Sequence, residues 1–181
     1  MVVSVPAPAV AAPTVTSTIN VGNRPISVAF SPNGKKAYTA NYYDDTVSVI
    51  TVATGAVADP ITVGRYPLSV AFSPNGKKAY VANSGDDTVS VINVATGTVQ
   101  GDPITVGDYP LSVAFSPNGK KAYVANTADY TVSVINVATG TVQGDPITVG
   151  TFPESVAFSP NGKKAYVANG DDGTLSVINT K

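Results

Sequence analysis

The sequence predicts an all-β protein made of four repeated units, each with four short antiparallel strands. The eleven residues SPNGKKAYVAN stand unchanged at residues 73–83, 116–126 and 159–169, and residues 31–41 differ from them at one position. The copies therefore start 42, 43 and 43 residues apart. A fixed period of this length is typical of repeat proteins, whose units bury their apolar faces against one another.

One unit, residues 66–107, divides into strands at its turn signals. Strands are expected at residues 69–72, 78–82, 88–93 and 98–106. Asn75-Gly76 joins the first two, and this pair is typical of hairpin turns because both residues tolerate a positive φ. No window carries the apolar period of a helix. Four strands in a repeat of about 40–50 residues predict a β-propeller with one blade per unit.

The middle of each unit resembles a known family. Tyr80-Val81-Ala82-Asn83, between SPNGKK and DDTVSVINVATG, is similar to the YVTN-type β-propeller repeat. The tetrapeptide recurs at Tyr123 and Tyr166, and residues 38–41 are a variant of it. The resemblance covers about residues 17–181; Ala replaces the usual third-position Thr, and Asn replaces Asp in the turn. It implies a propeller, often seven-bladed, of secreted and surface-layer proteins in microbes, and no single activity.

The chain is expected to contain one propeller domain after a flexible leader at residues 1–16, which lacks the positive charges of a signal peptide. The domain, residues 17–181, would begin with a lone fourth strand at 17–22. Blades 1, 2 and 3 would follow at 23–64, 65–107 and 108–150, and residues 151–181 would supply three strands of the last blade. The lone strand and the three-stranded blade complement each other, as in propellers that hide their sheet edges by closure.

The ring of blades could be completed in two ways. Pairing within one chain gives a closed four-bladed monomer, with blades about 90° apart, and exchange between two chains gives eight blades about 45° apart. The chain has no Trp, one Met and five Phe, and its third and fourth strands offer mostly Val, Ile, Thr and Ser. Small side chains fill a narrow wedge more closely than a wide one. We therefore favour an eight-bladed homodimer formed by strand exchange, with the four-bladed monomer as the alternative.

Composition argues against several classes of function. The chain has no His and no Cys, which excludes Ser–His and Cys–His nucleophile pairs and imidazole or thiolate metal sites. Adjacent Asp residues on a strand point apart, which disfavours a calcium site. We predict no enzymatic activity, no cofactor and no metal. A net charge of −1 disfavours nucleic acid as a ligand, and no apolar run is long enough for a membrane-spanning helix.

Charge is expected to separate onto two faces. The turn between the first and second strands and the turn between the third and fourth share one face of an up-and-down blade. The remaining loops share the other face. Eight of the eleven basic residues follow the first of these turns, and most acids lie in the remaining loops, so the faces would have opposite sign. Simple solvation of the hairpin ends is the alternative explanation.

Differences between the copies gather in the acidic set of loops. Binding residues concentrate on loops of rigid scaffolds, and Arg and aromatic residues are common anchors of interfaces. The candidate binding residues are Arg24, Tyr42, Tyr43, Arg65, Tyr66, Tyr109, Tyr130 and Phe152. We predict a non-enzymatic scaffold that presents a protein-interaction surface. A carbohydrate or small-ligand binder is the alternative, neutral drift of the loops accounts for the variation equally well, and the near-identical copies suggest recent amplification or consensus design.

Overall fold

The computed structural model describes residues 12–180, which contain seventeen β-strands and no helix. All strands pair antiparallel, in four sheets that follow the four repeats. The first sheet contains β1 (Pro25–Phe30), β2 (Lys36–Asn41), β3 (Thr46–Thr51) and β4 (Ile61–Thr62); the second contains β5 (Pro67–Phe72), β6 (Lys78–Asn83), β7 (Thr88–Asn93), β8 (Thr98–Val99) and β9 (Ile104–Thr105). The third contains β10 (Pro110–Phe115), β11 (Lys121–Asn126), β12 (Thr131–Asn136), β13 (Thr141–Val142) and β14 (Ile147–Thr148); the fourth contains β15 (Pro153–Phe158), β16 (Lys164–Asn169) and β17 (Thr174–Asn179).

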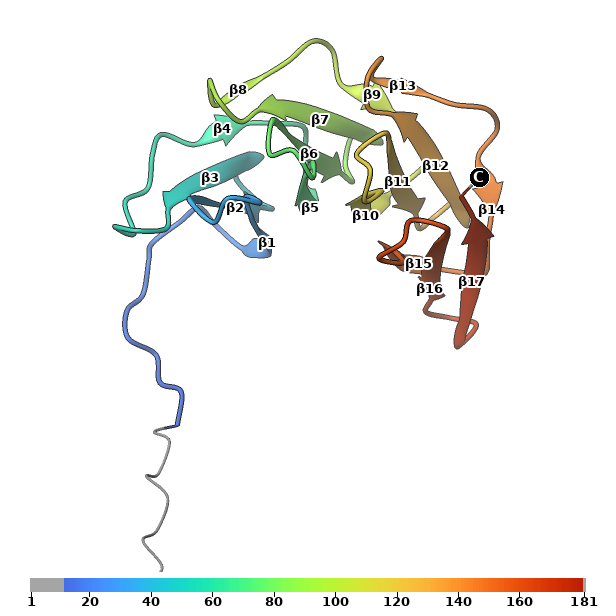
Figure 1. Ribbon diagram of the computed structural model, residues 1–181, viewed down its shortest axis with the longest axis horizontal. Coiled ribbons are helices and arrows are strands. Elements are labelled where there is room, and N and C mark those ends of the chain that lie inside the picture. Colours follow the sequence, from blue (N-terminus) through green and yellow to red (C-terminus); the bar gives the residue numbers. More distant parts are fainter. Residues whose placement is uncertain (1–11, 181) are drawn as a thin grey trace, which may run out of the picture.

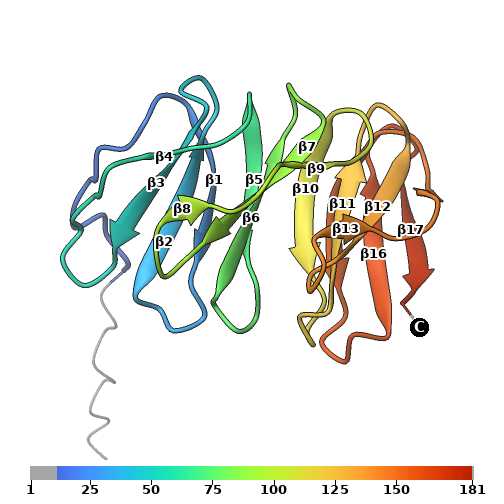
Figure 2. The same cartoon turned by 90° about the horizontal axis from the view of Figure 1, so that it is seen from above.

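The four sheets stand side by side around an open arc. Their first strands, β1, β5, β10 and β15, line the concave side, and the short strands β8, β9, β13 and β14 lie on the convex side (Figure 1). The turns point to the two opposite faces of this arc, as the second view shows (Figure 2). The first and last sheets lie at the two ends of the arc, so each leaves one face without a neighbouring sheet.

The first hairpin turn of each unit is stabilised by its own side chains. The Gly76 amide donates to the Ser73 carbonyl at 2.8 Å, and the Lys78 amide donates to Ser73 Oγ at 3.0 Å. The Ser73 hydroxyl in turn donates to Asn75 Oδ1 at 2.8 Å. Gly76 has a φ of 68°, whereas Asn75 is not among the residues with positive φ. The expected positive φ at both residues is therefore wrong, and the geometry is that of a turn closed by one left-handed Gly.

The fourth strand is not the continuous strand predicted at residues 98–106. It is divided into β8, in which Val99 lies opposite Ile92, and β9, in which Ile104 lies opposite Val89. Between them Gly101 adopts a φ of 65°, and Pro103 has no amide hydrogen to donate to β7. The fourth strand of the second blade is therefore interrupted at this point, and the third blade has the same division into β13 and β14 around Gly144.

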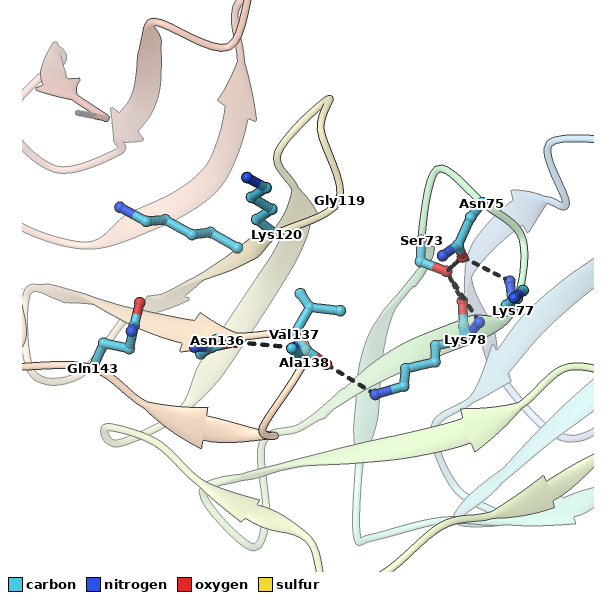
Figure 3. A pocket seen from close by; sticks show the side chains of 11 residues that line it. Ser73, Asn75, Lys77, Lys78, Gly119, Lys120, Asn136, Val137, Ala138 and Gln143 are labelled. Carbon is cyan, nitrogen blue, oxygen red and sulfur yellow. Dashed lines mark hydrogen bonds between the residues drawn. The ribbon is translucent and has the colours of Figure 1, made fainter.

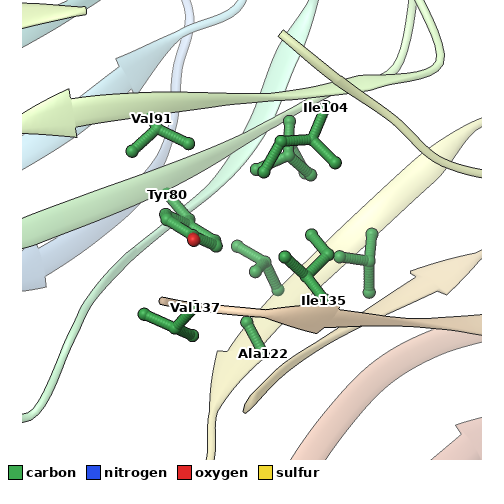
Figure 4. Close-up of a cluster of buried hydrophobic side chains, with 10 residues drawn as sticks. Tyr80, Val91, Ile104, Ala122, Ile135 and Val137 are labelled. Atoms are coloured by element: carbon green, nitrogen blue, oxygen red, sulfur yellow. The ribbon is translucent and has the colours of Figure 1, made fainter. Parts of the chain in front are cut away.

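The hydrophobic core lies between neighbouring sheets. In the contact between the second and third sheets, Tyr80 and Val91 face Ala122 and Ile135, and Ile104 covers the outer edge (Figure 4). The centroids of the Tyr80 and Phe115 rings lie 4.7 Å apart. The same ring pair occurs between the first and second sheets and between the third and fourth. The arc is therefore built from one junction used three times.

The predicted pairing of residues 17–22 with the last blade is not formed within the single chain. In the described part of the chain, residues 17–21 form no strand, and β17 pairs only with β16. The ends of the arc do not meet (Figure 1), so the closed four-bladed monomer is not the structure. The predicted leader at residues 1–16 lies mostly outside the described residues, and the eight-bladed homodimer stays a prediction.

Candidate functional site

Two sets of loops form the two faces, grouped as the sequence predicted. The Tyr42 amide donates to the Arg24 carbonyl at 3.1 Å, and the Ser84 amide donates to the Tyr66 carbonyl at 3.1 Å. We call this side the loop face: it carries the loops after each second strand and the segments before each first strand. On the opposite side the Val94 amide donates to the Lys77 carbonyl at 3.0 Å. We call that side the lysine face, after Lys35, Lys36, Lys77, Lys78, Lys120, Lys121, Lys163 and Lys164.

Five of the predicted binding residues have a left-handed backbone. Their φ angles lie between 53° and 57°, a region that bulky side chains rarely adopt. Such strain persists only where the surroundings hold it. The five residues are Arg24, Tyr66, Tyr109, Tyr130 and Phe152.

Two carboxylates of the loop face hold the backbone of Tyr66 and Tyr109 in place. The Tyr66 amide donates to Asp45 Oδ1 at 2.8 Å, and the Tyr109 amide donates to Asp87 Oδ1 at 2.8 Å. In each case the Asp comes from the preceding sheet. Asp45 and Asp87 are therefore structural clamps as well as charges. The sequence pattern did not show this role, because it depends on contact between residues 21 or 22 positions apart.

The structure brings four of the predicted residues together at the junction of the first two sheets. The Tyr42 ring stacks on Tyr66, with centroids 4.9 Å apart and planes 18° apart, and meets the edge of Tyr43 at 5.1 Å. The Arg24 guanidinium lies 4.5 Å from the Tyr42 centroid and donates to the Tyr43 hydroxyl at 2.9 Å. Cation–π and stacked contacts of this kind orient the side chains. We call Arg24, Tyr42, Tyr43 and Tyr66 the Tyr42 cluster.

The other predicted residues lie outside this cluster. Burial, followed by the nearby Tyr109, raises the pKa of Tyr42, which places Tyr109 in its electrostatic neighbourhood. Arg65 instead forms an ion pair with Asp86, with Nε 2.6 Å from Oδ1. Hydrogen bonds from the Arg65 amide and side chain lower the pKa of Asp86. Tyr130 and Phe152 are exposed on the loop face of the third and fourth sheets.

The lysine face carries two similar grooves between neighbouring sheets. One, of about 630 Å³, is lined by Ser73, Asn75, Lys77, Lys78 and Lys120, among others (Figure 3). Lys78 Nζ donates across it to the Val137 carbonyl at 2.9 Å, and Lys36 Nζ donates to the Val94 carbonyl at 3.0 Å. These Lys residues connect neighbouring sheets, a structural role that sequence reasoning missed.

A comparison with models of protein families assigns the chain to a family. The model of the YNCE-like β-propeller matches residues 2–125, more than half of the chain. The chain belongs to the YNCE-like β-propeller family. This agrees with the resemblance to YVTN-type repeats, and the prediction of an all-β propeller is confirmed. No curated protein matches the chain.

Solved structures resemble this YNCE-like propeller over most of its length. Hydrazine synthase of Kuenenia stuttgartiensis aligns with a TM-score of 0.82 and 26% identity, covering 92% of this chain and 49% of its own. A candidate 6-phosphogluconolactonase from Bacteroides uniformis aligns with a TM-score of 0.75 and 22% identity. This alignment covers 86% of this chain and 50% of the other. A functionally unknown protein from Desulfotomaculum acetoxidans aligns with a TM-score of 0.72 and 21% identity. This alignment covers 85% of this chain and 55% of the other. The YNCE-like chain thus spans about half the length of these structures.

Neither a metal centre nor a membrane-spanning helix was found in the described part of the YNCE-like propeller. Residues 12–180 contain no group of three or more His, Cys, Asp or Glu side chains arranged to hold a metal ion. They also contain no helix that is long and apolar enough to cross a membrane.

Proposed function

We propose that this YNCE-like propeller is a non-enzymatic scaffold whose loop face binds a protein partner, with residues 17–181 as the scaffold unit. The observation that carries the proposal is the Tyr42 cluster, in which three Tyr side chains and one Arg pack together at the surface. Tyr and Arg are enriched among the residues that dominate the energy of protein interfaces. Tyr43, whose ring is exposed, presents the outer surface of this anchor.

Rigidity of the loop face supports the same function. The Tyr66 backbone is held on both sides, because its amide donates to Asp45 and its carbonyl accepts from the Ser84 amide and hydroxyl. A side chain fixed before binding loses less conformational entropy when a partner docks. Tyr supplies a large contact area with only two side-chain torsions, as in antibody binding sites.

Enzymatic activity is a less favoured function for this chain. Hydrazine synthase is among the similar structures, so the fold itself is compatible with an enzyme. This chain has no His and no Cys, which removes the most common nucleophile–base pairs. The paired Asp86 carboxylate has a lowered pKa, which is the wrong direction for a general acid at neutral pH.

A carbohydrate or small ligand is the second candidate for the loop face. Tyr66, Tyr109 and Phe152 occupy equivalent positions in successive units, and all three rings are exposed. Aromatic rings stack on apolar faces of ligands, and neighbouring carboxylates accept hydrogen bonds from hydroxyl groups. This spacing of rings around the arc favours a repetitive ligand.

Binding arrays with matched face variants test the proposal. The parent protein is applied to arrays of peptides and of glycans. The loop-face variant carries Ala at Arg24, Tyr42, Tyr43 and Tyr66, and the control carries Ala at Lys35, Lys77, Lys120 and Lys163. We expect peptide binding that falls at least tenfold in the loop-face variant and persists in the control. Loss only in the control would overturn the proposal, and binding to glycans alone would favour the second candidate.

A further inference from the structure

The two ends of the arc expose apolar faces that are buried at every internal junction. On the first sheet, Val28 and Phe30 are 65% and 62% exposed, whereas Val70, which occupies the position of Val28 in the second sheet, is 5% exposed. On the last sheet, Leu175 is 62% exposed and Tyr166 is 39% exposed. Their counterparts Val47 and Tyr38 are fully buried. Each end therefore presents one half of a junction.

The two halves complement each other because they derive from one repeated contact. At the internal junctions, the side corresponding to Tyr166 and Leu175 always packs against the side corresponding to Val28 and Phe30. Residues 19–21 already lie on the first sheet, where Ile19 and Val21 help to line a groove of about 390 Å³ together with Val28, Phe30, Ile50 and Val52. Ile61 occupies the same place as Ile19 at the next junction and is buried there.

A single chain cannot join these ends without changing its curvature. The first and last sheets lie at opposite ends of the open arc (Figure 1). The three internal junctions share the same ring pair at 4.7 Å, so the curvature is set by a regular contact. A second copy carries both missing halves, because its two ends present the same two faces.

We infer that a second copy of this chain covers both end faces, so that two arcs close into one eight-bladed ring. Residues 17–21 of each copy add a fourth strand to β17 of the other. The register follows from the internal blades, in which Val47 pairs with Ile61 and Thr46 with Thr62. Ile19 accordingly lies opposite Leu175 of the second copy, and Asn20 lies opposite Thr174.

Three further contacts at the proposed junction follow from the equivalent residues of the internal junctions. Tyr166 packs on Phe30 of the second copy, as Tyr38 packs on Phe72. Lys164 donates to the Val52 carbonyl of the second copy, as Lys36 donates to Val94. The Val28 amide of the second copy donates to Ser155, as the Val70 amide donates to Ser27 at 3.2 Å. Every blade of the ring then has four strands, and no apolar sheet edge remains open.

A disulfide across the new strand pair tests both partner and register. The Val63 amide donates to the Asp45 carbonyl, so Asp45 and Val63 form a hydrogen-bonded pair of the antiparallel ladder. Hydrogen-bonded and non-hydrogen-bonded pairs alternate, so the next pair, Thr46 and Thr62, is a non-hydrogen-bonded pair. In such pairs the Cα atoms lie about 4.5 Å apart, which a disulfide can bridge. The chain has no native Cys, so the variant with Asn20→Cys and Thr174→Cys reports this one contact. Its control combines Asn20→Cys with Thr131→Cys, because Thr131 already pairs with Thr148 in its own sheet.

We expect light scattering of the parent to give twice the chain mass of 18.4 kDa. Oxidation should link the Asn20/Thr174 variant into a covalent dimer that reductant separates, and it should leave the control unlinked. A parent mass of 18.4 kDa, a mass of three or more chains, or a disulfide within one chain would each overturn the inference. A failure of the Asn20/Thr174 variant to cross-link would also overturn it.

A charge placed on the last sheet gives a second measurement that does not depend on cross-linking. Leu175 is exposed in the single arc, so Leu175→Asp leaves the internal junctions intact and places a carboxylate in the proposed contact. We expect this variant to have the mass of one chain with unchanged β-structure by circular dichroism. Val15→Asp is the control at an exposed Val outside the contact, and it should keep the mass of two chains. Retention of the dimer by Leu175→Asp would contradict the inference. Failure of the peptide and glycan arrays would leave these mass measurements unaffected.

Discussion

A buried Asn ends the second strand of every unit and connects it to the third. Asn83 is fully buried, and its Nδ2 donates to Thr88 Oγ1 at 3.1 Å and to Ser90 Oγ at 2.9 Å. Asn41, Asn126 and Asn169 make the same two bonds. Gly64 lies directly against this amide, since a Cβ at Gly64 would stand 2.7 Å from Asn83. The last residue of the repeated tetrapeptide is therefore structural.

Replacement of this Asn tests its contribution to stability. Asn83→Ala should lower the free energy of unfolding by about 1–3 kcal/mol, because the Thr88 and Ser90 hydroxyls lose a buried partner. Urea unfolding at one fixed protein concentration measures the change. Gln100→Ala, at an exposed side chain, should change stability by less than about 0.5 kcal/mol. Equal effects of the two substitutions would contradict the proposed role of the Asn.

The Tyr of the same tetrapeptide makes stability sensitive to alkaline pH. Burial raises the pKa of Tyr80 from 10.0 to about 12. The unfolded chain therefore loses this proton near pH 10 while the folded chain keeps it, and stability that is complete below pH 10 falls as the pH approaches 12. Burial also raises the pKa values of Tyr38 and Tyr123, which adds to the loss.

Tyr80→Phe should remove one part of this loss of stability at alkaline pH. Among the described residues, the Tyr80 hydroxyl has no hydrogen-bond partner, so the substitution should be close to neutral at pH 8. Between pH 8 and pH 11 the variant should lose less free energy of unfolding than the parent, as measured by urea titrations. An equal loss in both proteins would show that Tyr80 does not control the pH dependence.

Loops of the loop face combine strain with a clamp from the neighbouring sheet. Asp45 has a φ of 54° and accepts the Tyr66 amide, so one Asp both adopts and enforces a left-handed turn. Asn and Asp tolerate this region better than other non-Gly residues, because their side chains bond locally. The choice of Asp at this position therefore has two separable causes.

Three substitutions at Asp45 separate these causes. Asp45→Asn keeps an acceptor and tolerates the left-handed backbone, so it should match the parent within about 0.5 kcal/mol. Asp45→Gly loses only the hydrogen bond, and Asp45→Ala adds the cost of a positive φ, about 1 kcal/mol or more. Urea unfolding should rank the variants Asn, Gly, Ala in decreasing stability. A different order would argue against the clamp.

Local patterns in the sequence specified the strands but not the contacts between sheets. β7 begins and ends at the predicted residues 88 and 93, because its β-branched residues lie between clear turn signals. β5 begins two residues earlier than predicted, at Pro67, where pairing with Asn83 extends it. The division of the fourth strand and the left-handed aromatic residues depend on neighbouring sheets, and no local pattern indicates them. The composition of the loop face was predictable, whereas the stacking of Tyr42 on Tyr66 was not.

At the scale of the whole molecule, the arc separates charge and keeps its ends apolar. Nine of the twelve acids lie on the loop face, and eight Lys residues lie on the opposite face. The two end faces carry Val, Phe, Leu and Tyr. The proposed association through the ends would therefore leave both charged faces in water, where they favour solubility.

Deletion of the segment on the first sheet tests the role of that end. A chain without residues 1–22 loses Ile19 and Val21, and with them the strand proposed to cover β17. We expect loss of the two-chain mass and increased aggregation in light scattering, because two sheet edges stay open. Deletion of residues 1–11 is the control and should preserve mass and solubility. Parental behaviour of the longer deletion would contradict strand exchange.

The proposed pairing of two arcs also has a consequence for how such proteins can evolve. Because the contact between chains would copy the contacts within a chain, joining two genes head to tail would change no packed residue. The peptide link would only replace association by an intramolecular encounter, which raises the effective concentration of the two halves. After such a fusion the two halves could diverge independently, and binding residues could be specialised on one side of the ring alone.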